Sequence, residues 1–343
     1  MSGRINKPDT QADIEIRECL ATKDSFVMIA GAGSGKTTSL VKALKYIDDT
    51  EGKTLRQQGK KIACITYTTV AEKEILDDVG HDSFFRVSTI HSFLWELIRP
   101  FQKDIKNWVK AKVKSKLEEF EISRQNFTTR TRPNTRENNT RDTARYLHID
   151  SNIDSVPSFT YETDSNYLKG ILGHSDIISM VPSLINTNPL LQVILANRFP
   201  YFFIDESQDT ISEFVSAMKL VEQNVEGFCL GFFGDPMQKI YHTGSGAIVI
   251  EEGWREIQKP ENFRCSTSVL RVINSIRAAG DKLQQNGGRI ELVEGNPVLV
   301  EEVHKSSSCK RMTPEQLNSL RLDDTSQYSL LIRCGFLMKK LLM

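Results

Sequence analysis

The sequence has no excess of charge of either sign, no closely spaced cysteines and no long apolar run. Its 44 basic residues balance 44 acidic ones, which argues against a globally basic surface for nucleic acid but permits a local basic groove. Without a CxxC pair, the cysteines predict neither a zinc site nor a disulfide framework, and we expect buried reduced thiols. The six cysteines are Cys19, Cys64, Cys229, Cys265, Cys309 and Cys334.

We also expect neither a membrane span nor a signal peptide. No apolar run reaches the roughly 18 to 20 residues that a spanning helix needs. The first residues, MSGRINKPDTQADIEIREC, carry charges where a signal peptide has its apolar core. We therefore expect a cytoplasmic protein with no membrane partner. Its length of 343 residues predicts about two or three domains.

Short apolar runs predict buried strands, and helical patterns separate them. This alternation is typical of an α/β fold with an open, mainly parallel sheet. The predicted strands are residues 26–30, 61–66, 201–205 and 228–233.

The stretch 100–195 predicts an insertion into this α/β core. Within it, residues 103–121 form an amphipathic helical pattern with lysines mostly off the apolar stripe. Residues 123–145 are rich in Arg, Thr and Asn, so we expect a long exposed loop there. The apolar stripe consists of Ile105, Val109, Val113, Leu117 and Phe120.

A glycine-rich segment between the first strand and a helical pattern predicts a phosphate-binding loop (P-loop). Glycines let backbone N–H groups surround phosphate oxygens, and the following helix adds its positive dipole end. Lys36 would reach the β and γ phosphates of ATP, and the Thr37 hydroxyl would bind Mg²⁺. The alternative is a chance glycine-rich turn. The candidate nucleotide-binding residues are Ala30, Gly31, Ala32, Gly33, Ser34, Gly35, Lys36, Thr37 and Thr38.

Two acidic residues follow the predicted strand 201–205. In a parallel sheet the ligand site lies at the carboxyl ends of the strands, which would bring these residues beside the P-loop. Asp205 then suits the Mg²⁺ sphere, and Glu206 suits a general base that activates the attacking water. The alternative is a helix cap with acidic residues in the first turn.

The strand 228–233 leads into a Gly-Asp-Pro segment that contains Gln238. A glutamine at such a strand end can hydrogen-bond the γ-phosphate or the attacking water. Taken alone, the segment indicates an ordinary turn.

Together, seven segments in order resemble the motifs of superfamily 1 DNA helicases of the UvrD/Rep type, over residues 11–275. The fold that this resemblance implies is a RecA-like P-loop NTPase domain with a mainly helical insertion. The segments are Gln11, AGAGSGKTT (30–38), ITYTTVAEKEI (65–75), VSTIHSFLWELI (87–98), IDESQD (204–209), GDPMQKIY (234–241) and ENFRCS (261–266).

The resemblance implies a role for each matching residue. Gln11 would recognise adenine, and Phe263 would stack near the base. Gln238 would couple the γ-phosphate to DNA, and Arg264 would contact the γ-phosphate. The residues implied in single-stranded DNA binding are Thr66, Tyr67, Thr89, His91 and Tyr241.

The sequence departs from the family at two places. The family commonly has a base-stacking Trp shortly after Tyr241, and here His242-Thr243-Gly244 follows. In addition, residues 328–333 (YSLLIR) resemble the strand that opens a second RecA-like domain, but the later motifs, including an arginine finger, do not follow. We therefore expect that this chain carries about one half of a motor, with the second RecA-like domain largely missing.

We expect four segments from these patterns. They are the first part of an ATP-binding domain (1–99), the insertion (100–195), the second part of the ATP-binding domain (196–290) and the start of an incomplete second domain (291–343). The lysine face and the arginine-rich segment of the insertion fit either contact with DNA phosphates or an ordinary solvated surface.

Three functions fit these residues to different degrees. The first is an ATP-dependent DNA helicase or translocase acting on single-stranded DNA in repair, recombination or phage defence. The second is a split subunit that binds ATP and DNA with little turnover alone, and works with a second polypeptide such as a nuclease. The third, a small-molecule kinase, accounts for Lys36 and Asp205 but not for the other helicase-like segments.

Overall fold

The structure is a computed structural model that describes residues 3–241 and 244–287. The strand expected at 328–333, the domain expected at 291–343, and Cys309 and Cys334 therefore lie outside the described residues. The chain divides into two compact units. The first unit comprises residues 1–87, 199–212 and the described residues from 227 onward, and the second comprises residues 88–198 and 213–226.

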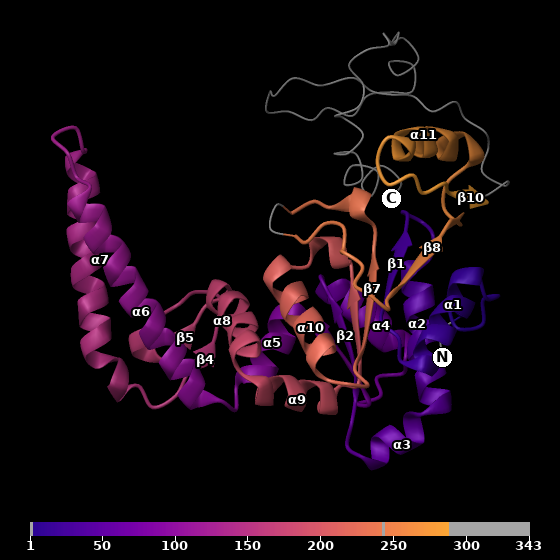
Figure 1. Ribbon diagram of the computed structural model, residues 1–343, viewed down its shortest axis with the longest axis horizontal. Helices are drawn as coiled ribbons and strands as arrows, with labels where there is room; N and C mark the ends of the chain where they lie inside the picture. Colours follow the sequence, from indigo (N-terminus) through magenta and orange to yellow (C-terminus); the bar gives the residue numbers. More distant parts are fainter. Residues whose placement is uncertain (1–2, 242–243, 288–343) are drawn as a thin grey trace, which may run out of the picture. The chain divides into compact units, whose positions relative to one another are not determined.

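The first unit is built around a six-stranded sheet with the strand order β3-β2-β6-β7-β1-β8 (Figure 1). The pairs β1–β7, β1–β8, β2–β6 and β6–β7 are all parallel. This confirms the predicted α/β fold. The strands are β1 (Phe26–Ala30), β2 (Ile62–Thr66), β3 (Phe85–Thr89), β6 (Tyr201–Asp205), β7 (Cys229–Gly234) and β8 (Arg255–Lys259).

The helices of the first unit begin where the sequence supplies caps. Thr10 forms a capping box with Asp13 at the start of α1, and Gly35 adopts a left-handed conformation directly before α2. The helices are α1 (Gln11–Thr22), α2 (Lys36–Thr50), α3 (Gly52–Gln57), α4 (Thr69–Asp78) and α11 (Thr267–Ala278), with the short 3₁₀ helices η3 (Ser207–Asp209) and η4 (Pro236–Gln238). A small pair of strands, β9 (Glu261–Asn262) and β10 (Asn286–Gly287), lies beside α11.

Three phenylalanines from neighbouring strands form the centre of the core. The ring of Phe233 meets those of Phe26 and Phe203 edge-on, with centroid distances of 5.5 and 5.8 Å. Gly231 lies between the rings, and a Cβ at this position would come within 2.7 Å of both Phe26 and Phe203. The close packing of these strands therefore requires glycine at position 231.

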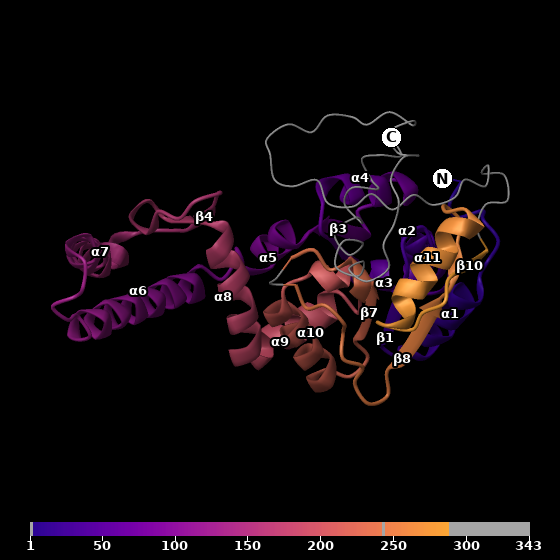
Figure 2. The same cartoon turned by 90° about the horizontal axis from the view of Figure 1, so that it is seen from above.

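The second unit is mainly helical, and one expectation for it was wrong. Residues 123–145 do not form a long loop, because most of them belong to a helix that begins at Pro133. Helices α6 and α7 lie side by side as an antiparallel pair (Figures 1 and 2), with Asn139 donating a 3.0 Å hydrogen bond to the Phe120 carbonyl. The elements are α5 (Ile90–Ile98), α6 (Gln102–Gln125), α7 (Pro133–Asn152), β4 (Thr160–Tyr161), β5 (Ile171–Leu172), α8 (His174–Thr187), α9 (Pro189–Arg198) and α10 (Ser212–Asn224), with the 3₁₀ helices η1 (Ile153–Ser155) and η2 (Tyr167–Lys169).

Two further features of the described residues concern helix length and the cysteines. Among the described residues no single helix is long and apolar enough to cross a membrane, and only α8 and α9 taken together pass that test, although they are bent by 104°. Cys19, Cys64, Cys229 and Cys265 are free, and all but Cys265 are buried.

Candidate nucleotide and nucleic-acid site

The predicted P-loop runs from the end of β1 to the start of α2. Gly33 and Gly35 have φ angles of 78° and 82°, a left-handed conformation that glycine adopts without strain. The hydroxyl oxygen of Ser34 is buried and has no hydrogen-bond partner among the described residues. The loop therefore has the backbone conformation and an unused polar atom that suit a phosphate ligand.

The two predicted acidic residues lie at the same edge of the sheet as the P-loop. Lys36 and Glu206 form an ion pair, with 3.1 Å between Nζ and Oε2, so the structure brings the P-loop lysine and the candidate base together. Asp205 is 3% exposed. Burial is the main cause that raises the pKa of Asp205 to about 7, the charge of Glu206 adds to the rise, and Lys36 opposes it.

These residues fit Mg²⁺ and ATP. One carboxylate oxygen of Asp205, Oδ1, is buried without a hydrogen-bond partner among the described residues, which is costly unless a cation or donor meets it. A divalent cation there would favour the ionised carboxylate. Asp205 and Thr37 would hold the metal, Lys36 and the loop amides would hold the phosphates, and the bound nucleotide would supply the phosphoryl group for transfer.

The segment that contains Phe263 and Arg264 is attached to the P-loop. Phe263 N donates a 2.9 Å hydrogen bond to the Gly33 carbonyl, and a Cβ on Gly33 would lie 2.7 Å from the Cβ of Arg264. Asn262 Nδ2 donates to the Ala32 carbonyl at 2.8 Å. Sequence reasoning assigned no role to Asn262, although it lies in the same motif as Phe263 and Arg264.

A second contact of the P-loop was also missed. Gln285 is 3% exposed, and a Cβ on Gly31 would collide with its amide at 2.3 Å. Both backbone groups of Gln285 are hydrogen-bonded to Asn274 of α11, each at 2.8 Å. No local sequence signal marks Gln285, because its role depends on a contact with residues about 250 positions earlier.

The side chains of Gln238 and Gln11 form hydrogen bonds with residues three and four positions away in the sequence. Gln238 Nε2 donates to the Asp235 carboxylate, and Gln11 Nε2 donates to Glu15 at 3.0 Å within α1. Asp235 is fully buried and also accepts two hydrogen bonds from Arg277 of α11, at 2.9 and 3.0 Å. The roles expected for Gln238 and Gln11 toward ATP remain predictions.

Two of the predicted DNA-binding residues form an exposed aromatic pair. The rings of Tyr67 and Tyr241 stack with centroids 4.9 Å apart and planes at 30°, and the residues are 38% and 42% exposed. Burial, Tyr241 and Asp209 raise the pKa of Tyr67, so its phenol stays neutral. Thr66 differs from this pair because it is buried, at the end of β2.

Sequence comparison adds an independent observation. The family of the UvrD/REP helicase N-terminal domain matches residues 13–248, which is more than half of the chain. The chain belongs to the UvrD/Rep helicase family. Membership supports a helicase-type function in general.

Three relatives illustrate the similarity to UvrD/Rep helicases and related proteins. Gabija protein GajB of Bacillus cereus (strain HuB5-5) is 27% identical over 374 residues, covering 87% of this chain and 54% of GajB. The ATP-dependent DNA helicase Rep of Buchnera aphidicola subsp. Acyrthosiphon pisum (strain APS) is 23% identical, covering 75% of this chain and 43% of Rep. The ATP-dependent DNA helicase PcrA of Staphylococcus epidermidis (strain RP62A) is 24% identical, covering 84% and 45%. The chain thus spans about half the length of these curated relatives.

The remaining predicted DNA contacts, Thr89 and His91, belong to the second unit. The ring of His91 lies 4.9 Å from that of His174. Burial lowers the pKa of His91, and the neighbouring His174 acts in the same direction. His91 is therefore a neutral imidazole near pH 7, and any contact with DNA would be a hydrogen bond or a ring contact rather than an ion pair.

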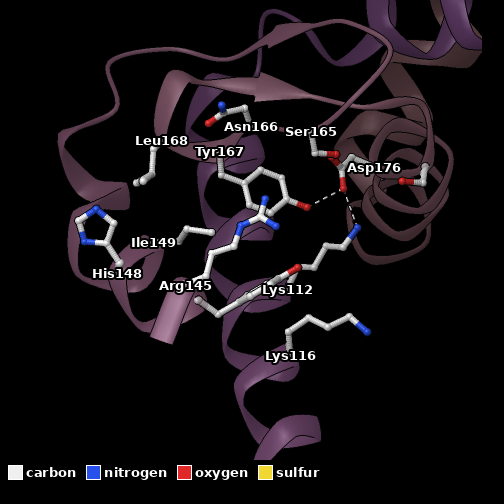
Figure 3. Close-up of a pocket in the computed structure, with 12 residues that line it drawn as sticks. Lys112, Lys116, Arg145, His148, Ile149, Ser165, Asn166, Tyr167, Leu168 and Asp176 are labelled. Atoms are coloured by element: carbon white, nitrogen blue, oxygen red, sulfur yellow. Dashed lines mark hydrogen bonds and ion pairs between the residues drawn. The ribbon is translucent and has the colours of Figure 1, made fainter. Parts of the chain in front are cut away.

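A cavity of about 420 Å³ lies within the second unit (Figure 3). Asp176, which lines the cavity, is 1% exposed and accepts hydrogen bonds from Lys112 at 2.6 Å and from the Tyr167 hydroxyl at 2.7 Å. Burial alone would raise the pKa of Asp176, but these bonds and those from Ser165 and Gly173 lower it. The buried charge of Asp176 is therefore paired with Lys112 within the second unit.

Four lysines of α6 form ion pairs or hydrogen bonds within the second unit. Their ammonium groups pair with acidic side chains or carbonyls of that unit, which favours a structural role over phosphate contact. The pairs are Lys106 with the Asp154 carbonyl, Lys110 with the Asp154 carboxylate, Lys112 with Asp176 and Lys116 with Glu119.

Proposed function

We propose that this chain carries the nucleotide-binding half of an ATP-dependent DNA helicase or translocase, which couples hydrolysis of Mg-ATP to movement on single-stranded DNA. The observation that carries the proposal is the meeting of Lys36, Asp205 and Glu206 at one edge of the sheet, with 3.1 Å between Lys36 and Glu206. The proposed setting is the cytoplasm, in DNA repair, recombination or phage defence.

Each residue of the site has a proposed task. Lys36 binds the β and γ phosphates, Thr37 and Asp205 hold Mg²⁺, and Glu206 accepts a proton from the attacking water. A base must be free to take that proton, so Glu206 must leave the ion pair with Lys36 when the lysine turns to phosphate.

Further residues of the site are proposed to recognise the nucleotide. Arg264 approaches the γ-phosphate from beside Gly33, and Phe263, which is 54% exposed, stacks near the base. Gln11 reads the adenine, and Gln238 links the phosphate to the DNA side.

The exposed Tyr67–Tyr241 pair is the proposed surface for single-stranded DNA. A base stacked on an aromatic ring gains about 1–3 kcal/mol irrespective of sequence. Thr66, Thr89 and His91 are proposed as additional contacts. Because Thr66 is 2% exposed, it would support the neighbouring Tyr67 rather than present a hydroxyl to the strand.

A second candidate is an ATP- and DNA-binding subunit with little turnover alone, acting with a second polypeptide such as a nuclease. An ATPase assay with and without single-stranded DNA separates the candidates: DNA-stimulated turnover supports the helicase, and binding without turnover supports the subunit.

The P-loop assignment is tested with Lys36→Ala. Loss of a charged hydrogen bond to phosphate should weaken binding of a fluorescent Mg-ATP analogue by about 10- to 100-fold and abolish any ATP hydrolysis. Lys45→Ala is the matched control, because Lys45 lies on the same helix and pairs with Asp49 at its exposed side. Unchanged affinity in Lys36→Ala would refute the assignment.

A further inference from the structure

The side chain of Gln208 joins the candidate base to the segment that follows β7. Its Nε2 donates to Glu206 Oε2 at 2.9 Å, and its Oε1 accepts from Asp235 N at 3.0 Å. The donor and acceptor ends of an amide are not interchangeable, so only one orientation satisfies both neighbours. At 2% exposed, Gln208 is poorly placed to replace either partner with bulk water.

One carboxylate oxygen of Glu206 takes part in two interactions at once. Its Oε2 lies 3.1 Å from Lys36 Nζ and 2.9 Å from Gln208 Nε2. Its backbone has a φ of 49°, a left-handed conformation that a residue with a side chain adopts only when its surroundings enforce it. A phosphate oxygen bound by Lys36 would compete with Glu206, and a shift of Oε2 would pull on the amide of Gln208.

The neighbours of Gln208 hold both sides of Tyr241. Asp209 Oδ1 accepts hydrogen bonds from the backbone N–H groups of Ile240 and Tyr241, at 2.9 and 3.3 Å. Gly246 N donates to the Gln208 carbonyl at 3.0 Å. The backbone that presents the Tyr241 ring is thus attached to the same short 3₁₀ helix that carries Gln208.

We propose that Gln208 is a positioning residue that couples the nucleotide site to the Tyr67–Tyr241 surface, by transmitting a displacement of Glu206 to the segment that carries Tyr241. This inference deepens the proposed function and rests on it. Coupling between two ligands is reciprocal. Nucleotide binding should therefore change the affinity for DNA, and DNA binding should change the affinity for nucleotide by the same factor.

The test measures this factor by binding alone, so that it needs no turnover. The full chain is titrated with a fluorescent, nonhydrolysable Mg-ATP analogue, without DNA and with a saturating oligo(dT) of about 15 nucleotides. In the wild type the two dissociation constants should differ by about 5-fold or more. In Gln208→Met, which keeps the size of the side chain but not its hydrogen bonds, the ratio should fall below about 2-fold.

The matched control is Gln192→Met in the second unit. Gln192 is also 2% exposed, and its amide likewise makes one donor and one acceptor bond, to the Ile185 carbonyl at 2.8 Å and from Asn224 at 2.9 Å. It should keep the wild-type ratio. Where Gln208→Met does not fold, Gln208→Leu replaces it: the branched side chain also lacks the donor for Glu206 and the acceptor for Asp235 N, and the ratio should again collapse.

The outcomes are distinct. A collapsed ratio in the Gln208 variants alone supports the inference. A wild-type ratio in those variants, an equal loss in Gln192→Met, or a wild-type chain that binds both ligands without coupling would overturn the inference and leave the proposed function standing. A wild-type chain that binds neither ligand would overturn the proposed function and this inference with it.

Discussion

At the scale of single residues, the buried ion pair of Asp235 with Arg277 carries a large desolvation cost. Asp235 is fully buried and Arg277 is 4% exposed, and two parallel hydrogen bonds join the carboxylate to the guanidinium. Such a pair costs desolvation on both sides, and its formation offsets that cost only while both partners remain. Asp235 also accepts from Gln238 and Met237 N, so the pair orders the segment after β7.

Arg277→Met should therefore destabilise the chain by about 3–5 kcal/mol, because it leaves the Asp235 charge buried without its partner. Urea unfolding followed by circular dichroism measures this loss. Arg271→Met changes an exposed arginine on the same helix and should stay within about 0.5 kcal/mol of the wild type. Equal stabilities of the two variants would show that the Asp235 charge is compensated in another way.

The residues that sequence reasoning could assign are those whose chemistry is local. Lys36, Asp205 and Glu206 belong to short motifs at strand ends, and the topology of a parallel sheet brings such ends together. Gln208 lies within the same acidic motif as Glu206, yet its role was not predictable. A glutamine has no distinctive chemistry until its partners are known, and Asp235 comes from a strand end 27 residues later.

At the scale of elements, β7 illustrates how one strand constrains its neighbours. It is paired with β6 on one side and β1 on the other, and the rings of Phe26 and Phe203 meet over Gly231. The spacing between the P-loop strand and the strand that ends at Asp205 therefore depends on the absence of a side chain at position 231.

Gly231→Ala should destabilise the chain by about 1–3 kcal/mol, because a Cβ only 2.7 Å from two rings forces them apart. The measurement is a shift of the urea midpoint. Gly3→Ala is the control, since a Cβ at Gly3 would meet nothing within 4 Å. If Gly231→Ala causes a smaller loss of stability in a chain that also carries Phe203→Leu, the strain lies at the Phe203 ring. An unchanged urea midpoint in Gly231→Ala alone would contradict the steric argument.

Helix α7 shows why an element can escape a composition-based prediction. Its arginines, threonines and asparagines are typical of loops, but only a narrow stripe of the helix needs to be apolar because it packs mainly against α6. Phe120 of α6 and Tyr146 of α7 meet edge-on with centroids 5.4 Å apart. Pro133 at the first turn was the available signal, since proline favours that position of a helix.

At the scale of the whole molecule, a buried charge cluster ties the beginning of the described chain to its sheet. Asp13 of α1 is 3% exposed and pairs with Lys42 of α2 at 2.8 Å and with Lys259 of β8 at 3.8 Å. Burial alone would raise the pKa of Asp13, but the hydrogen bonds from Lys42, Ser39 and Thr10 N outweigh it and lower the pKa to about 2.

This cluster predicts a loss of stability in acid. Since the pKa of Asp13 is about 2 in the folded chain and its ordinary value is 3.8, its ionisation stabilises the fold above pH 3.8, and this contribution disappears as the pH falls toward 2. In Asp13→Asn this contribution is absent at every pH. The deficit of the variant, meaning its free energy of unfolding compared with that of the wild type, should therefore be smaller at pH 3 than at pH 6 by about 1 kcal/mol. Urea unfolding at both pH values measures the two deficits.

Gln192→Met provides the comparison for this prediction, because Gln192 is also buried, at 2% exposed, and its amide does not titrate. Its difference from the wild type should change little between the two pH values. A deficit of Asp13→Asn that stays constant with pH would contradict the proposed dependence on ionisation of the cluster.

The contact of Gln285 with the P-loop has a consequence for how the chain is made. The two contacting residues are 253 positions apart, and at about 5–20 residues per second of synthesis the ribosome needs on the order of 10 to 50 seconds to deliver the later one. During that interval the phosphate-binding loop exists in the emerging chain without the amide that covers Gly31. Among the described residues of the first unit, its final surroundings are therefore completed late, well after the glycines themselves have been translated.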